Sequence, residues 1–171
     1  MALRTNKIYP LSGEAGHGGG IIQVKFATRE GEVTFSSDSV STYKTVLTCS
    51  ITPQSSSNKI FIHASADGIA NRSGNGEWEA WLGSGANATS NGSDPTSWTT
   101  LAMITGLGAW VNDGGQQTIG TYAVNYLDEP STTSTINYSI ICNRKTSSTW
   151  NSEFTGSNPR GTSITLWEVA S

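Results

Sequence analysis

The sequence predicts an all-β protein: an antiparallel β-sandwich, jelly-roll-like, with an extended N-terminal arm. Of its 171 residues, 24 are Ser and 22 are Thr, and 19 Gly and 12 Asn add turn formers, whereas strong helix formers are scarce. Apolar and polar residues alternate in short runs, and turn-forming clusters recur about every ten residues. Six Trp, five Tyr and four Phe supply a core, which argues against disorder.

The alternation is clearest in two segments. In segment 59–66, Ile60 and Ile62 share one face, opposite Phe61, which is the period of two that a half-buried strand requires. Segment 162–169 alternates in the same way. Strands are expected at about residues 21–28, 31–36, 44–52, 59–66, 77–83, 98–104, 118–127, 136–143, 149–154 and 162–169.

Residues 1–20 differ from the rest of the chain. They end in the triplet Gly18-Gly19-Gly20 and have few apolar residues, so they cannot form a core of their own. We interpret them as an arm that precedes a single sandwich domain of residues 21–171. Four apolar residues before the glycine-rich run are the candidate anchors by which this arm holds a partner: Leu3, Ile8, Tyr9 and Leu11.

The charge pattern argues against several classes of partner. The net charge is −3, and the ten basic residues form no run, which does not favour nucleic-acid binding through phosphate neutralisation. No segment approaches the roughly 18 apolar residues of a membrane helix, so no membrane insertion is expected. The first 20 residues lack the apolar stretch of a secretory signal peptide, which indicates synthesis in a cytoplasm.

The cysteines and histidines form no pattern typical of a metal site. Cys49 and Cys142 fall in separate expected strands; a disulfide between them is open, but a reducing site of synthesis favours two buried thiols. His17 and His63 lack neighbouring ligands at zinc spacing, and no calcium-loop spacing occurs. The sequence predicts neither a metal nor a cofactor.

Two patterns that could suggest catalysis have simpler explanations. Ser41 and Lys44 match S-x-x-K, but acylating enzymes need this Ser at a helix start, and here it runs into a strand. Glu77 and Glu79 share a strand face, as glycosidase carboxylates could, yet period-two alternation already accounts for them as a solvent face. We expect a protein that is not an enzyme.

Tryptophans are expected on both faces of the strands. Trp78 fits a core position, whereas Trp81 falls on the opposite face, and Trp167 lies opposite Leu166 in the last strand. A second face that carries Trp is either inside the domain or covered by a partner. The pattern leaves both interpretations open.

The order of several segments resembles a module of tailed-bacteriophage virion proteins, especially tail-fibre tips and small capsid-attached proteins of phages that infect aquatic bacteria. The segments span nearly the whole chain: Gly18-Gly19-Gly20-Ile21-Ile22-Gln23-Val24, Leu47-Thr48-Cys49-Ser50-Ile51-Thr52-Pro53, Ser55-Ser56-Ser57-Asn58-Lys59-Ile60, Leu127-Asp128-Glu129-Pro130, the strand of Tyr138, and Ser163-Ile164-Thr165-Leu166-Trp167-Glu168-Val169. The resemblance implies a non-enzymatic, homotrimeric β-sandwich on a virus particle. Typical fibres carry a long shaft before the tip, whereas this chain has only about 20 residues before its domain. Because each residue spans at most roughly 3.5 Å, this segment is too short for an extended fibre.

On this basis we expect a capsid decoration, or cement, protein that is located in the virion. Its arm would lie along capsid subunits, and its domain would trimerise above them and hold neighbouring subunits together through multivalent contacts. The Trp residues on the second face and the resemblance together suggest where the trimer interface lies. Its candidate residues are Trp81, Leu166, Trp167 and Val169.

The alternative is a tail-fibre or receptor-binding tip that recognises host surface glycans. Its contacts would come from surface loops such as residues 71–76 and 84–97, with the ring of Trp81 or Trp98 stacking on sugar. The candidate contact residues are Asn75, Asn91 and Trp98. A hydrolase built on the same sandwich is the third and weakest interpretation, because no convergent catalytic site is evident.

Overall fold

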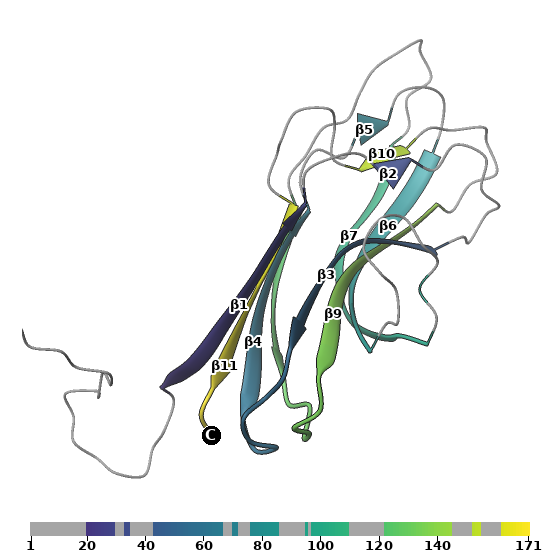
Figure 1. Cartoon of the computed structure of the whole chain (residues 1–171). Helices are drawn as coiled ribbons and strands as arrows, with labels where there is room; N and C mark the ends of the chain where they lie inside the picture. The colour runs from purple at the N-terminus through teal and green to yellow at the C-terminus, as the bar shows by residue number, and fades with distance from the viewer. Residues whose placement is uncertain are drawn as a thin grey trace, which may run out of the picture.

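The computed structural model in Figure 1 describes residues 20–29, 33–34, 43–66, 70–71, 76–85, 95, 97–109, 122–144, 152–154 and 162–171. Every regular element in this part of the chain is a strand. The strands are β1 (Ile21–Arg29), β2 (Val33–Thr34), β3 (Tyr43–Ile51), β4 (Lys59–Ala66), β5 (Ala70–Asn71), β6 (Gly76–Ser84), β7 (Thr99–Ala109), β8 (Tyr122–Asp128), β9 (Ile136–Arg144), β10 (Ser152–Phe154) and β11 (Thr162–Val169).

Eight strands form two antiparallel sheets that pack as a sandwich, with orders β1-β11-β4-β8 and β3-β9-β6-β7. When the short strands β2, β5 and β10 are set aside, the first, eighth, third and sixth strands make one sheet. The second, seventh, fourth and fifth make the other. This is the strand order of a jelly roll, which confirms the predicted fold class. Strands β2, β10 and β5 pair in a small third sheet at the end of the sandwich away from the C-terminus (Figure 1).

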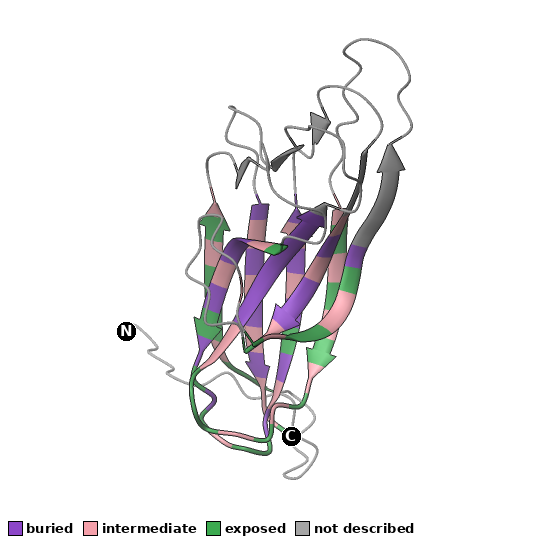
Figure 2. Ribbon diagram, turned by 90° about the vertical axis from the view of Figure 1, so that its right-hand side faces the viewer, coloured by how far each residue is buried: buried purple, intermediate pink, exposed green. Residues whose placement is uncertain are grey.

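The core lies between the two four-stranded sheets, where the central strands are buried along much of their length (Figure 2). Strand β4 alternates as its sequence predicts, since Ile60 and Ile62 are fully buried whereas Phe61 is exposed. Each large apolar side chain contributes about 1.5–3 kcal/mol when it is buried. The largest fully buried side chains are Tyr138, Ile51, Ile60, Ile62, Leu82, Ile140, Ile141 and Ile164.

Strand β1 closes one side of the sandwich with polar side chains. The guanidinium of Arg29 donates a hydrogen bond from Nη1 to the carbonyl of Val46 in β3, at 3.0 Å. The amide of Gln23 donates from Nε2 to the carbonyl of Thr52, at 2.7 Å. These bonds join the edge strand of one sheet to strand β3 of the other sheet and the segment that follows it, and they give the side chains of Gln23 and Arg29 hydrogen-bond partners.

The first and last described residues meet at one end of the sandwich. The backbone N–H of Ala170 donates to the carbonyl of Gly20 at 3.1 Å, and the ladder of β1 and β11 begins at the next pair. In Figure 1 the C-terminus accordingly lies near the start of β1. Pairing therefore starts at Gly20, and residues 1–19 of the predicted arm lie outside the described residues.

Both cysteines are free thiols in the core. Cys49 lies opposite Tyr138, and Cys142 is four residues further along β9. At a rise of about 3.3 Å per residue the two positions are ~13 Å apart, beyond the ~7 Å between Cα atoms that a disulfide tolerates. Burial raises the pKa of each thiol. The interpretation as buried thiols is confirmed.

The sequence misjudged some strand boundaries. Strand β7 continues to Ala109, well beyond the expected end at residue 104. Gly106 and Gly108 resemble turn formers, but they pair with Glu79 and Glu77 of β6. Pairing with a long neighbouring strand outweighed the weak strand propensity of these glycines.

Candidate functional site

A row of four apolar side chains crosses the outer face of the β1-β11-β4-β8 sheet. Val24, Trp167, Phe61 and Leu127 lie directly opposite one another on successive strands. The rings of Phe61 and Trp167 are 5.5 Å apart between centroids. Val24 is 51 % and Leu127 50 % exposed, so both ends of the row are open to solvent. We call these four residues the apolar row.

The neighbouring rows extend this surface without adding net charge. On one side Phe26, which is 64 % exposed, pairs with Thr165, and Nδ1 of His63 donates a 2.8 Å hydrogen bond to Oδ1 of Asn125. On the other side, Ile21 pairs with Val169. Next to Val169 on this side is Lys59, whose Nζ lies 2.6 Å from the Glu129 carboxylate. Among the described residues of this face, Lys59 is the one Lys or Arg and Glu129 is the one Asp or Glu. Their charges cancel.

Part of the outer face of the other sheet is covered by its own chain. The ring of Trp98 packs against Ile141 and contacts Tyr43 edge-on, with 5.7 Å between centroids. A Cβ at Gly83 would lie 2.5 Å from Cε3 of Trp98, so this close approach requires glycine. Ile141 is fully buried although it points away from the core. The two outer faces of the sandwich therefore differ. Part of the outer face of the β3-β9-β6-β7 sheet is covered by Trp98, whereas the outer face of the β1-β11-β4-β8 sheet, which we call the open face, is exposed to solvent.

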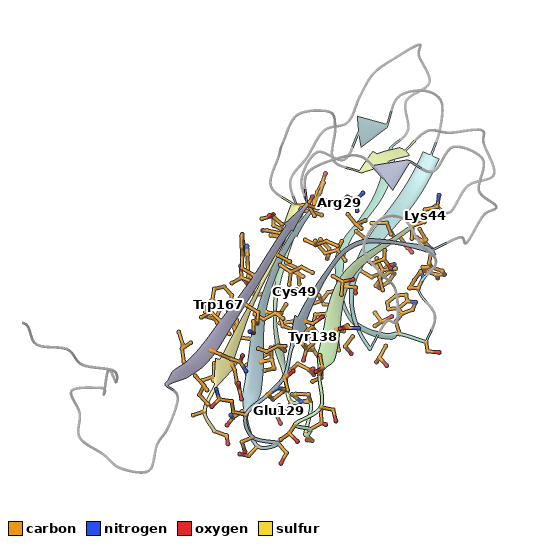
Figure 3. All side chains as sticks on the ribbon, in the orientation of Figure 1. Arg29, Lys44, Cys49, Glu129, Tyr138 and Trp167 are labelled. Carbon is orange, nitrogen blue, oxygen red and sulfur yellow. The ribbon has the colours of Figure 1, made fainter. Side chains whose placement is uncertain are left out.

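The structure divides the predicted interface residues among three environments. Trp167 lies on the open face, on strand β11 (Figure 3), and Val169 lies on the same face of that strand. Leu166 is fully buried between the sheets, so its assignment to an interface was wrong; in a strand that alternates, the neighbours of an outward Trp must point inward. Trp81 is opposite Ile141, on the outer face of the other sheet, and cannot share one flat interface with Trp167.

The predicted binding loops are only partly visible. Trp98, expected to stack on sugar, is half-buried and uses its ring against its own domain. Asn75 and Asn91 lie outside the described residues, as do the arm residues, which are Leu3, Ile8, Tyr9 and Leu11.

A buried carboxylate accepts hydrogen bonds from several segments at the end of the sandwich where Gly20 and Ala170 pair. Glu168 is fully buried and accepts hydrogen bonds from Asn58 Nδ2 at 2.5 Å, Gln23 Nε2 at 2.5 Å and the Gln54 backbone at 2.7 Å. Burial by itself would raise the pKa of Glu168, but these bonds and one from the Ser55 backbone lower it below its ordinary value. The carboxylate therefore joins β11 to β1 and to the turn before β4.

Tyr138 links the two sheets at the same end. Its hydroxyl donates a 2.6 Å hydrogen bond to Oδ2 of Asp128, which ends β8 in the opposite sheet. Burial, and then the bond to this carboxylate, raise the pKa of Tyr138 far above its ordinary value. The phenol therefore stays protonated and keeps donating across the physiological range.

Replacing Tyr138 by phenylalanine is expected to lower the free energy of unfolding by about 1–2 kcal/mol. The ring keeps its packing, but the carboxylate of Asp128 loses a donor. Urea unfolding at pH 7 measures the loss, and Tyr126→Phe on β8 is the matched control for removing a phenol. An equal loss in the control would show that the bond to Asp128 contributes nothing of its own.

The described residues contain no group of three or more His, Cys, Asp or Glu side chains placed to hold a metal ion. Within the same part of the chain, no helix has the length and hydropathy needed to cross a membrane.

Most of the open face was not predicted from the sequence. Val24, Phe26, Phe61 and Leu127 were not proposed as contact residues, although their exposure makes them its main apolar surface. A signal was available in segments 21–28 and 59–66, where apolar residues occupy the second face as well as the first.

The chain matches no protein-family model, no curated protein and no solved structure.

Proposed function

We propose that the chain is a non-enzymatic structural protein of a phage virion, a capsid decoration protein that binds capsid subunits as a trimer. The resemblance of its segments to phage virion modules supports this proposal, and so does the jelly-roll sandwich. A protein of this kind acts by burying surface against neighbours, so it needs a stable domain with an adhesive face rather than a reactive centre.

The observation that carries the proposal is the open face with its apolar row. Val24, Phe26 and Leu127 are each at least half exposed. Large apolar side chains grouped on one face, rather than scattered, are typical of surfaces that another protein covers. The neutral Lys59–Glu129 pair at the border adds no net charge that would restrict such contact.

The alternative function, glycan recognition by a fibre tip, gains no specific observation from the described residues. Trp98 is the described member of its contact set, and its ring packs on Ile141 and Tyr43 of its own domain.

Labelling of intact virions with antibodies raised against the chain tests the proposed function. We expect gold particles distributed over the capsid surface of the phage that encodes it. Label confined to the tail tip would favour the fibre-tip alternative, which a glycan array would then examine. Absence of the chain from purified virions, measured by mass spectrometry, would contradict both.

A further inference from the structure

We propose that the open face of the β1-β11-β4-β8 sheet is the surface through which copies of this chain bind one another. This inference deepens the proposed function and rests on it, because a decoration protein that acts as a trimer needs a surface for self-association. It keeps Trp167 and Val169 from the predicted interface and adds the rest of the apolar row (Val24, Phe61 and Leu127) together with Ile21 and Phe26.

The geometry of the face suits a flat protein partner. The apolar row runs across all four strands without interruption, from the edge strand β1 to the edge strand β8. Four strands at about 4.8 Å spacing and eight residues at about 3.3 Å rise give a projected area of roughly 500 Å². Protruding side chains increase the accessible area beyond the projection, toward the ~800 Å² that each partner contributes to a stable interface.

The charge of the face favours a second copy over a partner of opposite charge. The chain carries a net charge of −3, so two copies repel unless they meet through a neutral surface. On the open face, the charges of Lys59 and Glu129 cancel within the same subunit, at the border of the apolar row. Lys25 and Arg29 of β1 belong to the side toward β3 and add no charge to the open face.

The opposite outer face lacks this open character. Trp98 covers Ile141 and Gly83 there, so part of that surface is already occupied by the chain itself. Met103 is 47 % exposed on that side, at a position that pairs with Trp81. It provides a matched control, because it is a large apolar residue as exposed as Leu127 but lies on the other sheet.

The double variant Phe26→Lys and Leu127→Lys in the full chain tests the proposal. Sedimentation velocity should show a self-associated wild type at about 10 µM. The variant brings like charges together at the contact, and we expect association at least about 100-fold weaker, which leaves a monomer. Met103→Lys should sediment as the wild type does. Circular dichroism and thermal unfolding establish that each protein is folded.

Several outcomes would overturn the proposal. A wild type that is monomeric at about 100 µM would do so, as would equal dissociation in the Met103 control. If the lysine variant does not fold, Phe26→Thr with Leu127→Thr retains strand propensity, and unchanged association in that variant would count against the face. If serines at Leu3, Ile8, Tyr9 and Leu11 convert a monomer into an oligomer, the arm and not a second copy covers the face.

The test separates this inference from the proposed function. A monomeric lysine variant that still decorates particles would keep the self-association face and show that attachment does not need it. A chain that self-associates through this face but is absent from virions would refute the proposed function alone.

Discussion

Replacing Glu168 by alanine is expected to lower the free energy of unfolding by about 3 kcal/mol at pH 7, because the donors on Asn58, Gln23, Gln54 and Ser55 lose a charged acceptor inside the protein. The side chain is fully buried, so water cannot freely replace it. Glu129→Ala is the matched control; its carboxylate pairs with Lys59 at the surface, where such a pair contributes about 0–1 kcal/mol. Urea unfolding measures both.

The effect of Glu168 should depend on pH in a definite direction. Its pKa is lowered from an ordinary value of 4.5, so the folded state favours the carboxylate more than the unfolded state does. The stabilisation is complete above that ordinary value and is lost as pH falls through the lower pKa of the folded state. The difference between the wild type and Glu168→Gln should therefore shrink on going from pH 7 to pH 3. A constant difference would show that the carboxylate charge is not what the donors bind.

Serine substitution of the four arm anchors, which are Leu3, Ile8, Tyr9 and Leu11, is expected to abolish attachment to the particle. Each apolar side chain contributes about 1.5–3 kcal/mol on full burial, so even partial burial of four implies a loss of at least about 1,000-fold in affinity. Ordering an arm costs about 1–2 kcal/mol per residue, which such contacts must offset. Co-sedimentation with particles that lack the chain measures the binding.

The matched control replaces polar residues of the same segment, Thr5, Asn6 and Ser12, with alanine and should bind as the wild type does. The domain itself should be unaffected, because pairing begins at Gly20. Unchanged binding of the serine variant would place the attachment surface on the sandwich. Loss of host-cell binding with particle attachment intact would favour the fibre-tip alternative instead.

The fold could be predicted well from the sequence because apolar and polar residues alternate along its strands. Segments 59–66 and 162–169 appear with the expected boundaries, since their alternation matches burial residue by residue. The turn before β4 is also local, since the backbone N–H of Asn58 donates to the carbonyl of Ser55 within a run of turn-forming residues. Information of this kind is present in neighbouring residues and needs no tertiary contact.

The candidate site was harder to predict because alternation defines two faces without saying which is inside. In β1, Val24 and Phe26 have the pattern of core residues, yet they point outward. Their direction is fixed by pairing with β11, where Leu166 occupies the core and Trp167 does not. Pairing between residues some 140 positions apart, such as Val24 with Trp167, cannot be deduced from either segment alone.

The hydrogen bond between Gly20 and Ala170 also determines how the domain would bear a mechanical load. A tether formed by residues 1–19 would pull on β1 at the end where it pairs with the last residues of β11. Strand β1 runs along the length of the sandwich (Figure 1), so a pull along this length would act parallel to the strand. The ladder from Ile21 to Arg29 would then be sheared as a unit, with its hydrogen bonds sharing the force, rather than opened one bond at a time.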